Sequence, residues 1–293
     1  MTTMRRAVIG LLVITTCVLL TGCGLIGSEP TPTPTMAIPT PTMEPMAAMV
    51  NGEGITMVEY QAELDRYVAA SNETGASAPG NLEPKTLILD ELINNRLLSQ
   101  AAYQSGFQIN EVELESRVTQ LAEQIGGTQA LQDWQNLYGY SDASLRQALQ
   151  RSIAAAWMRD KIIAAVPLQT EQVHARQILL ADEQTAQAVK AQLDAAVNFS
   201  ELAFQYDSIT GGDLGWFPHG YLNIPEVEAA AFSLEVGKYS DPVRSDIGWH
   251  IILVIEKDPA HELSPDALQS MQHQALNEWL TQRRSESTID ILI

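Results

Sequence analysis

Apolar residues recur at helical spacing through the first half of the chain, up to about residue 166. Between Val112 and Ile125 they lie three or four positions apart, which places them on one face of a helix. Asn110 is a typical N-cap for this helix, and two glycines at 126–127 are typical of its end. Pro84 opens a second long segment of this kind, which Gly106 ends. The pattern predicts an α-helical domain over residues 47–168.

A short apolar segment precedes these helices. It is followed by an Asn51–Gly52 turn signal and by Thr56, which is suited to cap a helix that starts near Val58.

From residue 171 the pattern changes to short apolar strands that alternate with short helices. "VHARQILL" at 173–180 predicts a strand, and helices are expected at 183–197, 199–206 and 225–234. A glycine-rich turn, "GGDLGWFPHG", occupies 211–220, and two further strands are expected at 239–245 and 248–256. The order strand, three helices, two strands predicts an α+β domain over 171–258 with a small, mainly antiparallel sheet.

One more helix is predicted in residues 262–293, where Ser264 and Pro265 supply the N-cap and the first helical position. Its apolar residues share one side, so a helix that stands alone after a complete domain must dock on another element. The apolar faces of the N-terminal helices are the expected partner.

The first residues follow a different logic. Arg5 and Arg6 precede an apolar run at 7–20, which reads as a secretory signal over residues 1–22. The run ends in "LTGC", which resembles the lipobox of bacterial lipoproteins and implies that Cys23 is lipidated after cleavage. An ordinary signal or an uncleaved anchor are the alternatives. Residues 23–46 are dominated by Pro and Thr and predict an extended tether that holds the folded part away from a membrane.

Composition narrows the classes of function. The chain has 17 basic and 36 acidic residues, and loss of Arg5 and Arg6 with the signal changes the formal net charge from −19 to −21. Such a charge disfavours nucleic acid and favours basic or neutral partners. With Cys17 removed and Cys23 acylated, no disulfide is expected, and the five histidines show no metal-binding spacing. We expect neither a metal nor another cofactor.

Several separated motifs carry a resemblance to a known family. In order, "HARQILL", "GGDLGWF", "EAAAFSL" and "DPVRSDIGWHII" resemble the PpiC-type parvulin domain of peptidyl-prolyl isomerases. The surrounding arrangement of lipoprotein signal, "VNGEGIT", helical domain, parvulin insert and returning helix is similar to foldases of the SurA and PrsA type. In that family the helical segments on both sides of the parvulin domain form one chaperone module.

The resemblance implies a pocket for the proline ring. Leu214 and Phe217 match its positions in the glycine-rich turn, Leu222 or Asn223 fills a position where the family usually has Met, and Val227 stands where Phe is usual. Plain core packing is the alternative interpretation for each apolar residue of this set.

The resemblance also implies a polar centre, from which this chain departs. Gln177 replaces the family's first histidine, and Ser208 or Ile209 takes the place of its central Cys or Asp. Ser245 provides a hydroxyl at a position usually held by Thr, and His250 matches the second histidine. A neutral network from Gln177 through Ser208 to His250 is one hypothesis; a buried histidine that only supports the sheet is the other.

These features predict a lipid-anchored foldase on the extracytoplasmic face of the cell membrane, which isomerises X-Pro bonds in unfolded secreted polypeptides. The alternative is a holdase chaperone whose degenerate parvulin domain only binds peptides. A solute-binding lipoprotein is disfavoured, because that class needs two lobes of alternating strands and helices. Residues 171–258 hold 5 basic and 14 acidic residues, which disfavours phosphorylated clients.

Overall fold

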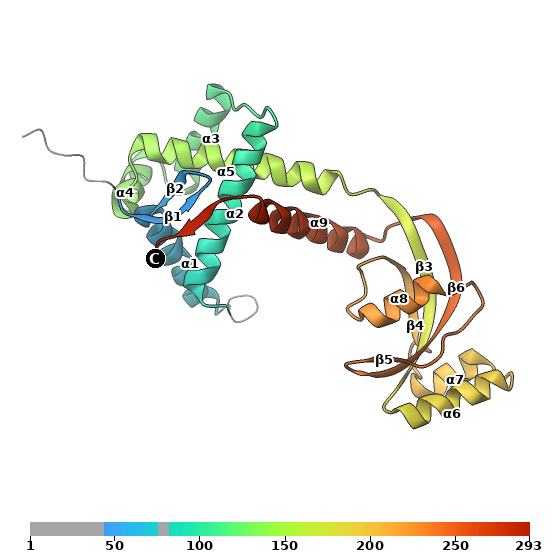
Figure 1. The fold of residues 1–293 in the computed structure, drawn as a ribbon. Helices are drawn as coiled ribbons and strands as arrows, with labels where there is room; N and C mark the ends of the chain where they lie inside the picture. The colour runs from blue at the N-terminus through green and yellow to red at the C-terminus, as the bar shows by residue number, and fades with distance from the viewer. Residues whose placement is uncertain (1–43, 76–81) are drawn as a thin grey trace, which may run out of the picture. The chain divides into compact units, whose positions relative to one another are not determined.

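The computed structural model of this chain describes residues 44–75 and 82–293, and forms two antiparallel sheets with helices around them (Figure 1). The expected signal peptide, the lipidation site Cys23 and nearly all of the expected tether lie outside these residues. The fold is α+β, as the sequence predicted.

The first sheet has three strands in the order β2-β1-β7, formed by β1 (Met46–Val50), β2 (Glu53–Thr56) and β7 (Ile289–Ile291). Asn51 and Gly52 both have positive φ, 53° and 83°, as a tight two-residue hairpin turn requires. β7 pairs with β1 and was not expected from the sequence. The backbone N–H of Asn51 also donates to the carbonyl oxygen of Thr288 at 2.8 Å, so the last residues of the chain complete a sheet begun at residue 46.

In the described part of the chain, the hairpin is followed by the helices α1 (Met57–Thr74), α2 (Pro84–Gln104), α3 (Glu111–Gln124), α4 (Thr128–Tyr138) and α5 (Asp142–Ala164). Thr56 and Asn110 accept hydrogen bonds from the first turns of α1 and α3, which confirms both predicted caps. None of the described helices is both long and apolar enough to cross a membrane.

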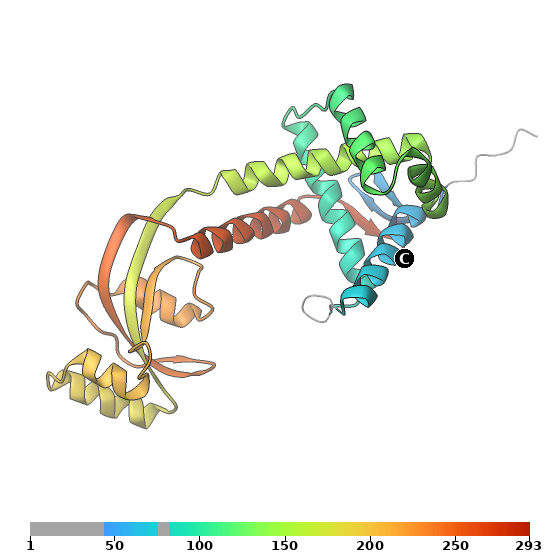
Figure 2. The ribbon, with the colours of Figure 1, turned by 180° about the vertical axis from the view of Figure 1, so that it is seen from behind.

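The last helix, α9 (Pro265–Ser285), starts at the predicted Ser264 cap and packs beside α5 and α2 (Figures 1 and 2). Arg284 of α9 donates to Asp90 Oδ1 at 2.9 Å and to Asn94 Oδ1 at 2.8 Å, both on α2. The helix α9 therefore docks on helices of the N-terminal half, as its sequence predicted.

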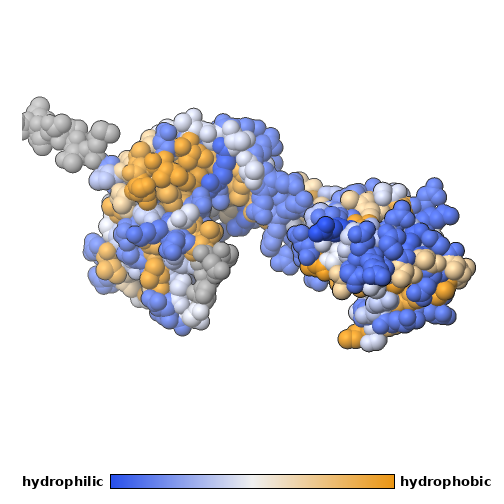
Figure 3. Space-filling model, turned by 60° about the horizontal axis from the view of Figure 1, so that its bottom comes forward, coloured by the Kyte–Doolittle hydropathy of each residue, from blue (hydrophilic) through white to orange (hydrophobic). Residues whose placement is uncertain are grey.

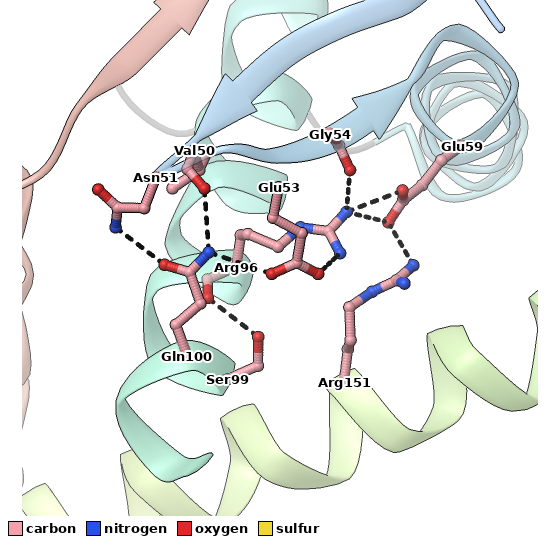
Figure 4. Close-up of polar contacts among 9 residues, drawn as sticks. All are labelled: Val50, Asn51, Glu53, Gly54, Glu59, Arg96, Ser99, Gln100 and Arg151. Carbon is pink, nitrogen blue, oxygen red and sulfur yellow. Dashed lines mark hydrogen bonds and ion pairs between the residues drawn. The ribbon is translucent and has the colours of Figure 1, made fainter. Parts of the chain in front are cut away.

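A buried charge network joins the hairpin to three helices (Figure 4). Arg96 of α2 is 3% exposed and lies 2.8 Å from a carboxylate oxygen of Glu53 and 3.0 Å from one of Glu59. It also donates to the carbonyl oxygen of Gly54, and Arg151 of α5 donates to Glu59 at 3.3 Å. The Arg96 guanidinium thus links α2 to β2 and α1, and Glu59 extends the network to α5.

The second sheet has four strands in the order β4-β3-β6-β5. They are β3 (Gln169–Leu180), β4 (Asp213–Pro218), β5 (Val243–Ser245) and β6 (Gly248–Glu262). Helices α6 (Glu183–Asp194) and α7 (Phe199–Tyr206) pack on one face against Ile178, Leu180 and Ile251, and α8 (Pro225–Ser233) packs on the other (Figure 2).

The glycine-rich segment corrects one expectation. The sequence predicted a turn throughout 211–220, whereas the structure places Asp213–Pro218 in the edge strand β4, paired antiparallel with β3. Proline and glycine are tolerated there because an edge strand leaves one row of backbone groups unpaired. The element order is consequently strand, two helices, strand, helix, two strands.

Candidate active site

The α8 face of the second sheet carries an apolar region and a polar pair side by side. Residues on β3 alternate between the two faces, so Val173, Ala175 and Gln177 share the α8 face. On β6, His250 shares this face with the apolar Ile252 and Val254. His174 lies on the other face, as its odd spacing from Gln177 predicted.

His250 lies at the centre of the polar group. Its side chain is fully buried, its Nε2 atom lies 2.7 Å from Ser245 Oγ, and its Nδ1 atom lies 2.8 Å from Gln177 Oε1. Because an amide oxygen only accepts, the Nδ1 atom carries the proton and donates to Gln177, while Nε2 accepts from the Ser245 hydroxyl. The two partners therefore fix one tautomer of the ring.

Burial lowers the pKa of His250 below its ordinary value, and the nearby carboxylate of Glu226 opposes this shift only in part. The imidazole is accordingly neutral at pH 7. A neutral ring bonded on both sides can orient Gln177 but has no charge to offer.

The hydrogen bonds run directly from Gln177 to His250, not through Ser208. Ser208 is exposed in the turn after α7, and no hydrogen bond joins its side chain to either residue within the described part of the chain. The neighbouring Ile209 is 90% exposed and does not enter the polar group. The NH₂ group of Gln177 makes no hydrogen bond to any described residue, so it remains available to donate.

Four of the residues expected to form a proline pocket belong to or pack against one apolar cluster on this face, and they differ in exposure. Phe217 and Val227 are buried at 0% and 1% exposure, in contact with Val173, Ile252 and their neighbours. Leu214 and Leu222 pack against the cluster and are partly exposed, whereas Asn223 is exposed. Leu214 and Leu222 therefore present apolar surface to the solvent, whereas Phe217 and Val227 are buried within the cluster.

Two acidic residues that the sequence analysis did not single out hold the loops around the cluster. The carboxylate of Asp207 accepts hydrogen bonds from the Thr210 hydroxyl and from the backbone N–H groups of Thr210, Ile209 and Gly212. These bonds, above all that from the Thr210 hydroxyl, lower the pKa of Asp207 to about 2. The sequence signal for this role is that Asp207 lies at the end of a helix, before a Thr and two glycines, where an Asp side chain commonly accepts hydrogen bonds from the backbone of a turn.

Glu228 of α8 has the same function for the next loop. Its two carboxylate oxygens accept from the backbone N–H groups of Gly220 at 2.7 Å and Leu222 at 3.0 Å. The loop that carries Leu222 and Asn223 is therefore tied to the helix that carries Val227.

Gly212 brings the glycine-rich segment against Gln177. Its φ is +71°, a Cβ atom there would lie 1.8 Å from the carbonyl oxygen of Gln177, and the Gln177 backbone N–H donates to the Gly212 carbonyl at 2.8 Å. No other residue fits this position, because any side chain would displace the strand that presents Gln177.

Comparison with known proteins agrees with this architecture. The SurA-like N-terminal domain family matches residues 2–149, and the PPIC-type PPIASE domain family matches residues 168–256. A foldase protein PrsA from Caldanaerobacter subterraneus is 31% identical over 227 residues, which cover 71% of this chain and 72% of that protein. The chain belongs to the PrsA foldase family. The resemblance inferred from the sequence motifs is confirmed.

A second relative and a solved structure are also similar to this chain. The foldase protein PrsA of Geobacillus kaustophilus is 33% identical over 182 residues, which cover 58% of this chain and 62% of that protein. The crystal structure of a peptidylprolyl isomerase, PrsA, from Bacillus cereus is 22% identical, with a TM-score of 0.42, and covers 83% of this chain and 86% of that one.

Proposed function

We propose that this protein is a foldase that catalyses cis–trans isomerisation of X-Pro bonds in unfolded polypeptides. The observation that carries the proposal is the Ser245–His250–Gln177 group, which lies on the same face of the sheet as an apolar cluster. The PPIC-type domain match and the PrsA relatives support the same activity.

The reaction requires no covalent chemistry. Rotation about the X-Pro bond passes a barrier of about 18–20 kcal/mol, because the twisted amide loses its resonance. In that twisted state the prolyl nitrogen regains a lone pair and becomes a better hydrogen-bond acceptor. A site that binds the ring by its apolar faces and places one donor near the nitrogen binds the twisted state more tightly than either planar isomer.

Gln177 is the residue that we assign as this donor. Its Oε1 atom is held by His250, and this orients the unpaired NH₂ group of the same amide. Ser245 in turn holds His250, so it acts as a positioning residue one step further from the substrate. Leu214 and Leu222 supply the apolar wall, and Phe217 and Val227 support it from within the cluster. Ser208 has no part in the proposal.

The remaining parts of the proposal concern place and clients. "LTGC" at residues 20–23 supports lipid attachment through Cys23, and the Pro/Thr-rich segment after it supports a tether on the extracytoplasmic face of the membrane. The net charge of −19 favours clients that are basic or neutral unfolded chains over acidic or phosphorylated ones.

A peptide exchange assay tests the activity. Two-dimensional NMR exchange on an unphosphorylated X-Pro peptide with purified protein is expected to show a measurable acceleration of cis–trans exchange. Exchange only at the uncatalysed rate would show that the protein is not an isomerase of this peptide and would contradict the proposed catalysis.

A groove on the helical part favours a second function, the binding of unfolded chains without catalysis. The groove lies between α5 and α9, has a volume of about 560 Å³ and is lined largely by apolar side chains, among them Met158, Ile162, Met271 and Trp279. Methionine-rich grooves adapt to varied apolar partners. Figure 3 also shows a broad apolar area on the helical part of the chain, in the face drawn there.

Aggregation measurements separate the two functions. Trp279→Ser is expected to weaken suppression of the aggregation of an unfolded client and to leave peptide isomerisation intact. Equal suppression of aggregation by the wild type and the variant would show that the groove does not bind unfolded clients.

A further inference from the structure

One side chain links the first hairpin to the last strand of the described chain. Asn51 lies in the two-residue turn between β1 and β2 and is exposed. Its NH₂ group donates to Gln100 Oε1 at 2.9 Å and to Ser287 Oγ at 3.1 Å. Its Oδ1 atom accepts from the backbone N–H of Thr288 at 2.9 Å. These three bonds, which we call the Asn51 clasp, hold the segment that leads into β7 against the hairpin.

The clasp requires an amide at position 51. Gln100 cannot turn its own amide to meet a carboxylate there, because its Nε2 atom already donates to the Val50 carbonyl at 3.0 Å and to Glu53 Oε2 at 3.1 Å (Figure 4). A carboxylate at position 51 would therefore face the Gln100 amide oxygen without a hydrogen between them. It would also add a second negative charge beside Gln100, next to that of Glu53.

The residue after Asn51 makes this change chemically accessible. Asn51–Gly52 is the only place in the sequence where glycine follows asparagine. The Gly52 backbone nitrogen can attack the Asn51 Cγ atom: the N–Cγ bond forms, the Cγ–Nδ2 bond breaks and ammonia leaves. Water then opens the resulting imide ring to aspartate or isoaspartate. Glycine favours the attack because it has no Cβ atom, and no described residue comes within 4 Å of where that atom would lie.

The clasp opposes the reaction for as long as it is closed. To close the imide ring, the Asn51 side chain must turn onto the Gly52 nitrogen, which breaks its bonds to Ser287 and Thr288. β7 has only three residues, and Ile291 is 58% exposed, so the segment is of the kind that opens locally at low cost. The attack therefore becomes possible when β7 opens.

We propose that Asn51 is a deamidation site and that loss of its amide releases β7 from β1 irreversibly. The product lacks the two donors of the clasp and carries a charge beside Glu53. Its isoaspartyl form also lengthens the backbone of a turn that only two residues span. α9 stays tied to α2 through Arg284, so the first sheet opens without undocking the helix. The proposal does not depend on the isomerase function.

Peptide mapping by mass spectrometry tests the site. In purified protein kept in mildly alkaline buffer, deamidation at Asn51 is expected to be at least about tenfold faster than at Asn223, which is exposed but followed by the β-branched Ile224. Deamidation of Asn51 no faster than that of Asn223 would overturn the site.

A variant tests the protection by the clasp. Ser287→Ala removes one of its bonds, and is expected to speed deamidation of Asn51 while that of Asn223 stays the same. An Asn51 rate that this variant leaves unchanged would overturn the protection.

Amide hydrogen exchange tests the release of β7. The Leu292 N–H donates to the Ala47 carbonyl at 3.0 Å, and it is expected to exchange about tenfold faster in deamidated protein and in Asn51→Asp than in the wild type. The amides of β3 are the internal control and should exchange at the same rate in all three. Equal exchange of Leu292 in deamidated and intact protein would overturn the release.

Discussion

At His250, a fully buried imidazole keeps both ring nitrogens hydrogen-bonded, one to the Ser245 hydroxyl and the other to the Gln177 amide oxygen. A glutamine at position 177 preserves the acceptor that the Nδ1–H group requires, and at the same time offers an NH₂ group that a histidine lacks. Glutamine in place of histidine therefore keeps the hydrogen bond to His250 within the sheet and adds an NH₂ donor that can face a substrate.

Gln177→Glu tests this division of labour. A carboxylate keeps an oxygen for His250 but has no NH₂ donor, so kcat/KM for an X-Pro peptide is expected to fall by about tenfold or more. Circular dichroism of the variant checks that the fold persists. A variant that turns over as fast as the wild type would show that the NH₂ group has no part in catalysis.

Gln177→His is the reciprocal change, and it restores the histidine that the parvulin family usually has at this position. A gain in turnover is expected if only the chemistry of this site has diverged while its geometry persists. Turnover below that of the wild type would mean that the neighbouring side chains have adapted to glutamine.

The protonation of His250 provides a further prediction at this scale. Since burial lowers its pKa in the folded protein, the unfolded chain takes up a proton first as the pH falls below about 6.5. Titration of His250 therefore leaves the free energy of unfolding unchanged above that pH and lowers it progressively below that pH. NMR titration of the imidazole is expected to give a lower pKa in the folded protein than in urea; an equal or higher value would contradict the assigned burial.

At the scale of elements, the second sheet depends on two backbone approaches that leave no room for side chains, at Gly212 and Gly248. Gly212 matters most for the site, because it contacts the backbone of Gln177 itself. Asp207 stabilises the turn that leads into it.

Gly212→Ala is expected to destabilise the protein by at least about 3 kcal/mol, since it combines a left-handed backbone with a clash against Gln177. Gly237 is the matched control: its φ is +78°, and a Cβ atom there would have no neighbour within 4 Å. Gly237→Ala should cost only about 1–2 kcal/mol, from backbone strain alone. Urea unfolding measures both, and equal losses would show that the close approach to Gln177 carries no energy.

The charge network of the first sheet gives the corresponding prediction for the helical part. Arg96→Met leaves Gln100 as the partner of Glu53 and Arg151 as the partner of Glu59, and is expected to cost about 2 kcal/mol. Arg159→Met, at an exposed pair with Asp160, should change the unfolding free energy by less than about 0.5 kcal/mol. If the two variants unfold at the same urea concentration, the network of Figure 4 does not stabilise the fold.

Local signals in the sequence predicted most helices and caps, because a cap such as Asn110 or Ser264 acts on the residues next to it. The strand β4 was read as a turn, because its glycines and proline are typical of turns and only pairing with β3 makes it a strand. β7 depends on pairing with residues more than 200 positions away, and three residues carry no periodicity that reveals this.

The candidate site shows the same division. Family motifs located Gln177, Ser245 and His250, but the direct bond between Gln177 and His250 depends on the register of β3 against β6, which the sequence does not state. The position of Ser208 outside this hydrogen-bonded group was not predictable for a related reason, since the loop held by Asp207 decides where that hydroxyl lies.

At the scale of the whole molecule, the second sheet and its helices are inserted between α5 and α9, and α9 and β7 return to complete the part begun by β1. We propose that the helical part binds unfolded chains and that the sheet with the candidate site isomerises their X-Pro bonds.

The central claim is that the Gln177–His250–Ser245 group and its apolar border isomerise X-Pro bonds. The most direct measurement is the cis–trans exchange rate of Ala-Leu-Pro-Phe with wild-type protein and with Gln177→Glu. The account predicts an acceleration by the wild type that the variant reduces by about tenfold or more. Exchange at the uncatalysed rate with both proteins would contradict it.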